Sequence, residues 1–129
     1  MTKLSRRSLA WVSAFWCGIG LQAQDERSLK AASVLHVVAI QWREDATEAG
    51  KEAVLGGIDA MARKIPGIVR VWTHTLRSQP PEFTFSFAIE FENQAAANVY
   101  AVHPVHEEWA MMLEKVRERS YSYQISNRP

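Results

Sequence analysis

The stretch from residue 83 to residue 92 alternates almost perfectly between large apolar residues and smaller or polar ones. A side-chain period of two is typical of a β-strand that buries one face. That face would be strongly aromatic, because it consists of Phe83, Phe85, Phe87, Ile89 and Phe91. An apolar face of this kind has to pack against a second layer. The segment therefore predicts a strand inside a layered domain.

The remaining elements follow from apolar spacing and from helix start and stop signals. Strands are predicted at 34–42, 68–76 and 120–126, with a loop at 77–82, and helices are predicted after Thr47, from Asn93 or Gln94, and from Pro104. Pro66 and Gly67 would end the first helix. The order is β-α-β-β-α-β, with the second helical region broken at Pro104. This is the ferredoxin-like plan of the α+β class.

Gly56 and Gly57 lie inside the first predicted helix. Each glycine costs about 1 kcal/mol relative to alanine in a helix interior, so the pair needs a compensating role. Two explanations are open. Either another element approaches the helix closely at this point, or the missing side chains leave room for a ligand.

The first strand, 34–42, carries apolar residues on both faces, as expected for a central strand that is covered on two sides. One face holds His36, Val38, Ile40 and Trp42, and the other holds Leu35, Val37 and Ala39. Helices cover only one side of a ferredoxin-like sheet, so the second side needs another cover. We therefore predict a homodimer whose two sheets pack against each other.

The N-terminal residues have the order of an export signal. Lys3, Arg6 and Arg7 precede an uncharged apolar run at 9–21, which is shorter than the roughly 20 residues that cross a bilayer. The two adjacent arginines resemble a twin-arginine signal. We expect an export signal at 1–24, a polar tether at 25–33 and one domain at 34–126. The mature protein would be periplasmic or secreted, without a stable membrane anchor.

Charge and cysteine content exclude two function classes. Loss of residues 1–24 removes three of the 15 basic residues and none of the 14 acidic ones, which leaves a formal charge of −2. Such a balance gives no basic footprint, so we predict no nucleic-acid partner. The single cysteine, Cys17, lies within the predicted signal. The mature chain would therefore have neither disulfides nor thiol chemistry.

The segment from Tyr100 to His106 gathers a phenol and two imidazoles at a helix break. His103 precedes Pro104 and is thereby disfavoured in the helical region, while Pro104 suits the first position of a new helix. His106 would then lie in the first turn, where the helix dipole favours a neutral ring. A neutral imidazole beside a tyrosine can act as a base, although the same residues could simply pack. His103, His106 and Glu107 form a poor metal cage, and we predict no metal.

Four segments together resemble the stress-responsive dimeric α/β barrel family, Dabb. They are His36-Val-Val-Ala-Ile, Ile65-Pro-Gly-Ile-Val, Ala88-Ile-Glu-Phe-Glu92 and Tyr100-Ala-Val-His103-Pro104-Val-His106. The resemblance implies a ferredoxin-like protomer that closes a barrel with a second copy. In a cyclase branch of the family, which uses no cofactor or metal, the roles of acid/base pair would fall on His106 and Tyr100. His36 matches a histidine of the cyclase pocket.

Two departures from the cyclase pattern argue against transferring its reaction. Phe85 stands where that branch has a histidine, and Gln124 to Asn127 lacks its acidic residue. We therefore predict a domain that binds a small apolar or aromatic molecule without established catalysis and without a cofactor. The alternative is a cofactor-independent cyclase-like or lyase-like enzyme that uses His106 and Tyr100. The predicted pocket, which could equally be plain core, is lined by His36, Val38, Ile40, Leu55, Ile58, Trp72, Phe85 and Phe87.

Overall fold

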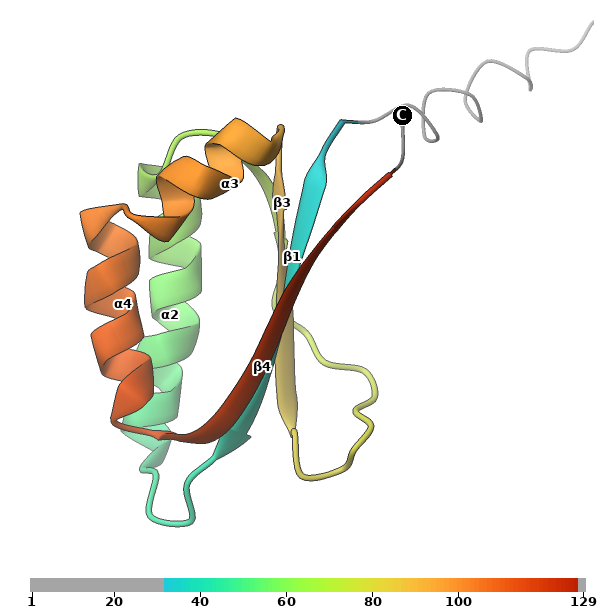
Figure 1. Cartoon of the computed structure of the whole chain (residues 1–129). Helices are drawn as coiled ribbons and strands as arrows, with labels where there is room; N and C mark the ends of the chain where they lie inside the picture. Colours follow the sequence, from blue (N-terminus) through green and yellow to red (C-terminus); the bar gives the residue numbers. More distant parts are fainter. Residues whose placement is uncertain (1–31, 128–129) are drawn as a thin grey trace, which may run out of the picture.

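The computed structural model describes residues 32–127 (Figure 1). The predicted export signal and most of the predicted tether lie outside these residues. The elements, in chain order, are β1 (Val34–Trp42), α2 (Glu48–Lys64), β2 (Ile68–Trp72), β3 (Phe85–Phe91), α3 (Gln94–Ala101), α4 (Pro104–Glu114) and β4 (Arg117–Ser126). None of these helices combines the length and the apolar composition that crossing a bilayer requires.

The sheet has the strand order β2-β3-β1-β4, and all of its neighbouring strands are antiparallel. Figure 1 shows the three helices on one side of this sheet. The arrangement is the ferredoxin-like β-α-β-β-α-β fold, and the break at Pro104 divides the second helical region into α3 and α4. The predicted fold class is confirmed.

Local sequence signals account for the helix ends. The Thr47 side chain accepts a hydrogen bond from the backbone N–H of Gly50 at 3.1 Å and caps α2. Asn93 caps α3 in the same way, by accepting from Ala96 at 2.9 Å. Gly67 follows α2 with a φ of 82°, a conformation that side chains rarely adopt. These caps explain why the predicted helix starts were right.

The hydrophobic core lies between the helices and the sheet. Each fully buried aliphatic or aromatic side chain there contributes roughly 1.5–3 kcal/mol relative to exposure. Its members from the sheet and the long helix include Val34, Val38, Ile40, Phe87, Ile89, Phe91, Val54, Ile58 and Met61. The residues of β3 that face the helices, such as Phe87, Ile89 and Phe91, are thus those that the alternation predicted to be buried.

Strand β2 is shorter and more irregular than the predicted strand at 68–76, because it ends at Trp72. The pairing register with β3 shifts between Ile68 and Arg70. This bulge lets both Ile68 and Val71 pack against the core. Beyond the strand, the Thr75 hydroxyl bonds both the carbonyl and the N–H of Ser86, at 3.0 and 2.7 Å. A side chain thus takes over the ladder contact that a longer strand would have made.

Two other boundaries differ from the prediction. Strand β4 begins at Arg117 instead of residue 120, and β3 begins at Phe85 instead of Phe83. Phe83 is buried, but its ring packs on Tyr121 with centroids 5.0 Å apart, and the Arg119 guanidinium lies over it. The pairing register puts Tyr121 and Ala39 side by side on the side of the sheet away from the helices. Phe83 therefore does not belong to the aromatic inner face.

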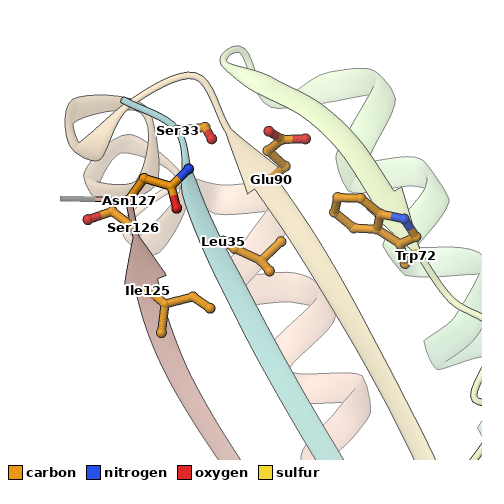
Figure 2. A pocket seen from close by; sticks show the side chains of 7 residues that line it. All are labelled: Ser33, Leu35, Trp72, Glu90, Ile125, Ser126 and Asn127. Atoms are coloured by element: carbon orange, nitrogen blue, oxygen red, sulfur yellow. The ribbon is translucent and has the colours of Figure 1, made fainter. Parts of the chain in front are cut away.

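We call the side of the sheet that the helices leave uncovered the open face. Register pairs Leu35 with Ile125 and Val37 with Tyr123 on this face. Its exposed apolar side chains are Tyr121, Tyr123, Ile125 and Trp72, which are 58%, 56%, 53% and 43% exposed. In Figure 2, Ile125, Leu35 and Trp72 lie around a shallow hollow of about 210 Å³, with Glu90 at its rim. Exposed apolar side chains therefore gather on the open face, as predicted from β1, beside the ion pair of Arg70 and Glu90.

Candidate functional site

A cavity of about 190 Å³ lies between α4 and the sheet, beside the end of α3. One wall is a stripe of α4, whose members recur at helical spacing. The opposite wall comes from β1 and β4, and the β4 residues are Arg117 and two small serines. The lining residues are His36, Val38, Tyr100, His106, Trp109, Ala110, Leu113, Glu114, Arg117, Ser120 and Ser122.

The helix break brings Tyr100 and His106 into contact, as the sequence predicted. Their ring centroids are 4.3 Å apart. Tyr100 is 3% exposed and also touches Phe91, at 5.0 Å between ring centroids, and His36, at 5.8 Å. Three of the predicted site residues, from β1, α3 and α4, therefore meet at one end of the cavity.

His106 is held in one tautomer by the end of α3. Its Nδ1 lies 3.3 Å from the carbonyl oxygen of Ala101. Because a carbonyl can only accept, Nδ1 carries the proton and Nε2 keeps its lone pair. Burial lowers the pKa of His106, while the Ala101 carbonyl and Glu107 raise it in part. The result is a neutral imidazole whose Nε2 keeps a lone pair, in a residue that lines the cavity.

Burial also determines the state of the two other groups at this end. It raises the pKa of Tyr100, so the phenol stays protonated at neutral pH. Burial lowers the pKa of His36, the repulsion that a second protonated ring at His106 would cause lowers it further, and the backbone of Tyr123 raises it in part. Both side chains are therefore neutral and able to exchange hydrogen bonds with a bound molecule.

Three buried side-chain polar atoms find no hydrogen-bond partner within residues 32–127. They are His36 Nδ1, Tyr100 Oη and Arg117 Nε, and all three belong to residues that line this cavity. An unsatisfied buried polar group costs roughly 1–3 kcal/mol, and folded proteins contain few of them. Their gathering around one cavity marks it as the candidate site.

Trp109 connects the cavity to the long helix. Its indole N–H donates to the carbonyl of Val54 on α2 at 2.8 Å. A Cβ added at Gly57 would lie 2.4 Å from Trp109 Cδ1, whereas one at Gly56 would meet nothing within 4 Å. Close approach therefore explains Gly57, whereas Gly56 has neither a close neighbour nor a place in the cavity lining. The Trp109 ring also stacks near His106, with centroids 6.0 Å apart.

Trp72 was wrongly placed in the predicted pocket. It lies on the open face, 43% exposed, with the Arg70 guanidinium 5.5 Å from its ring centroid. The bulge after Ile68 is the physical reason, because one extra residue transfers every later side chain to the other face. The strict alternation used for the prediction could not include such a shift.

The remaining predicted pocket residues divide between cavity and core. His36 and Val38 line the cavity. Ile40, Ile58 and Phe87 are 2% exposed or less and belong to the core, so they offer no surface to a ligand. Phe85 is half-buried and stacks between Trp42 and Phe87. Leu55 is half-buried on α2 and does not line the cavity.

Sequence reasoning missed the β4 wall. Ser120 and Ser122 pair with Ile40 and Val38, so they share the helix-facing side of the sheet. A recognisable signal was present, because the large Tyr121 and Tyr123 alternate with small serines.

His103 has a structural role, because its Nδ1 accepts a hydrogen bond from the N–H of Val105 at 3.2 Å and caps α4. No set of three potential metal ligands gathers anywhere in residues 32–127.

Solved structures with the same fold are numerous, although no curated protein matches the sequence. A Dabb family protein from Mesorhizobium loti is 19% identical, with a TM-score of 0.63, over 73% of this chain and 95% of its own. A dimeric protein of unknown function from Bacteroides fragilis is 21% identical, with a TM-score of 0.60, over 74% and 96%. SnoaB of Streptomyces nogalater, described as a cofactor-independent oxygenase, is 19% identical, with a TM-score of 0.62, over 77% and 96%.

These identities are too low to transfer an activity, so the structures support the fold alone. The family model adds a match in sequence. The model of the stress responsive A/B barrel domain matches residues 34–126, from the first residue of β1 to the last of β4. The chain therefore belongs to the stress-responsive A/B barrel (Dabb) domain family.

Proposed function

We propose that the cavity beside Tyr100 and His106 binds a small molecule that carries polar groups on an apolar body. The observation behind this proposal is the set of three unpartnered buried polar atoms around one cavity. Val38, Trp109 and Leu113 supply the apolar part of the lining. An apolar cavity with a few convergent polar groups is the usual form of a small-molecule site.

A fragment screen by ligand-observed NMR tests this proposal, with small aromatic alcohols, ketones, amides and acids as probes. We expect some probes to change their NMR signals when the protein is added. These changes should be smaller with a Tyr100→Phe variant, which removes only the hydroxyl. Val99→Phe serves as the control, because Val99 lies exposed on α3 and does not line the cavity. A screen without any binder at millimolar concentration would count against the proposal.

The second candidate function is acid–base catalysis without a cofactor, and the tautomer of His106 favours it. Nε2 would accept a proton from a carbon next to a carbonyl group, while the Tyr100 phenol donates a hydrogen bond to the developing enolate oxygen. The proton then returns from Nε2 to carbon or oxygen. SnoaB, a cofactor-independent oxygenase, is an example of chemistry without a cofactor on this fold.

Deuterium incorporation separates binding from catalysis. Acetophenone incubated with the protein in D₂O would exchange its methyl protons faster than in buffer, and NMR would detect the loss of signal. His106→Ala would abolish the acceleration. If the protein binds acetophenone but does not accelerate the exchange, the cavity functions in binding only, and the second candidate fails.

The open face would be covered by a second copy of the chain. A sheet surface with Tyr121, Tyr123 and Ile125 each more than half exposed is an uncommon patch for a monomer. The Bacteroides fragilis neighbour, which has the same fold, is described as dimeric. Sedimentation velocity should give a dimer, and a stable monomer at micromolar concentration would overturn this part.

The last part of the proposal is that the protein is exported. The basic residues and apolar run within residues 1–24 have the order of a signal that directs the mature domain to the periplasm or the exterior. Replacement of both Arg6 and Arg7 by lysine should stop export if the twin-arginine route is used. Fractionation of cells that express either form decides this, and continued export of the variant would indicate the general secretory route.

A further inference from the structure

The end of the cavity away from Tyr100 holds Arg117, whose positive charge the proposed function leaves unassigned. Arg117 donates from Nη1 to the hydroxyl of Ser120 at 2.8 Å, and its Nη2 contacts the carboxylate of Glu114. Its Nε is buried and unpartnered within the described chain. Ser122 also lines the cavity but lies opposite Val38, nearer to the His36 end.

The two polar ends are separated by an apolar middle. His106 and Glu114 are eight residues apart on α4, which corresponds to about 12 Å along the helix. On the opposite wall, Val38 pairs with Ser122, and His36 lies two residues before Val38 on β1. Arg117 pairs with Trp42, at the other end of β1. A bound molecule would therefore reach from a neutral polar end to a cationic end.

We propose that the cavity binds an aromatic carboxylic acid in one defined orientation, with its carboxylate on the Arg117 guanidinium and the Ser120 hydroxyl. This inference rests on the proposed small-molecule function and adds the charge of the ligand. The ring would lie between Val38, Trp109 and Leu113. A carbonyl or hydroxyl group at the far end of the ligand would meet Tyr100 and His106.

Charge and size both favour a small acid over a larger neutral ligand. Guanidinium stays protonated under all ordinary conditions, and its hydrogen bonds to carboxylates are stronger than those to neutral acceptors. The competing carboxylate of Glu114 is 61% exposed, so it is well solvated and weakly held. A volume of about 190 Å³ equals that of roughly six waters, which suits one ring with a short chain.

Two matched probes test the inference: 3-phenylpropionate and its neutral amide, 3-phenylpropionamide, titrated into the protein and followed by Trp fluorescence or NMR. Wild type should bind the acid about tenfold more tightly than the amide, as a charge-assisted contact predicts. Arg117→Gln should remove that preference, because it should weaken acid binding about tenfold and amide binding much less. Glu114→Gln should strengthen acid binding several-fold, because it removes the competing carboxylate.

The outcomes distinguish this inference from the proposed function. If wild type binds acid and amide equally and Arg117→Gln alters neither, the cationic site is wrong while a small-molecule cavity stands. If neither probe binds at millimolar concentration, both proposals fail for this ligand class. Should Arg117→Gln not fold, Glu114→Gln and the salt dependence of wild type decide. Added salt must then weaken acid binding but not amide binding, and equal responses would overturn the inference.

Discussion

The two faces of the sheet are incomplete in opposite ways. On the helix-covered face, burial is nearly complete, but Tyr100, His36 and Arg117 each have a buried polar atom without a partner among residues 32–127. On the open face, large apolar side chains such as Tyr123 and Ile125 remain exposed. Unpartnered polar atoms call for a molecule that forms hydrogen bonds, whereas uncovered apolar area calls for another apolar surface. The difference separates a ligand site from an assembly surface.

The largest expected effect would come from charging the open face. In a Tyr121→Glu, Tyr123→Glu double variant, two carboxylates would have to be desolvated against an apolar partner surface. We expect the dimer dissociation constant to rise by about a hundredfold or more. Sedimentation velocity across a concentration series measures this change. Val99→Glu, at an exposed site on α3, is the matched control and should leave the dimer intact.

Two adjacent glycines on α2 test the packing on the helix-covered face, because their replacement by alanine should change the free energy of unfolding in opposite directions. Gly57→Ala would place a Cβ 2.4 Å from Trp109 Cδ1, so we expect the free energy of unfolding to fall by about 1–3 kcal/mol. Gly56→Ala meets open space and should raise it by about 1 kcal/mol, the difference in helix propensity. Urea denaturation of both variants gives the two values. Equal effects at the two positions would contradict the close packing of α4 on α2.

The fold was largely predictable because its signals are local. Thr47, Asn93 and Pro104 start helices through their own backbone and side-chain preferences. The alternation in residues 83–92 identified the core side of β3. The contact of Tyr100 with His106 was predictable for the same reason. Pro104 begins a new helix, and this places His106 in the first turn of that helix.

What could not be predicted depends on pairing between distant segments. The bulge in β2 moves Trp72 to the open face, and only the register with β3 reveals it. Ser122 becomes part of the site because it lies opposite Val38 on β1. The alternation of Tyr121 and Tyr123 with serines indicates a strand with two different faces, but only the pairing with β1 shows that the serine face borders the cavity. Arg117 was missed because β4 begins three residues earlier than predicted.

The hydroxyl of Tyr100 distinguishes a ligand site from ordinary packing. Because Tyr100 Oη has no hydrogen-bond partner in the described chain, Tyr100→Phe leaves no other buried group unsatisfied. We expect the free energy of unfolding to stay constant or to rise by up to about 1 kcal/mol. Ligand binding should weaken about fivefold to tenfold if the hydroxyl contacts the ligand. Thermal melts with and without bound probe measure both, and a destabilised variant with unchanged ligand shifts would assign the residue to structure.

The smallest expected effect is the pH dependence of the free energy of unfolding. It reports on the helix-covered face, because His36 and His106 both lie on that face. The pKa of each is lowered from the ordinary 6.5, mainly by burial. Both rings therefore bind protons less readily in the folded chain than in the unfolded one. The free energy of unfolding should be level above about pH 6.5 and should decrease as pH falls from there through the lower folded values.

Urea denaturation at pH 7.5, 6.0 and 5.0 would measure this decrease, and variants assign it. Removal of one titrating ring by His106→Gln should reduce the slope below pH 6.5, and the double variant with His36→Gln should nearly abolish it. Asp45, whose pKa is lowered from 3.8 by Arg43, contributes only in more acidic solution. The interval from pH 6.5 to 5 is thus governed by imidazoles. A slope that stays the same in the double variant would show that these rings are as well solvated in the folded chain as in the unfolded one, and the cavity could then not be the buried neutral site described above.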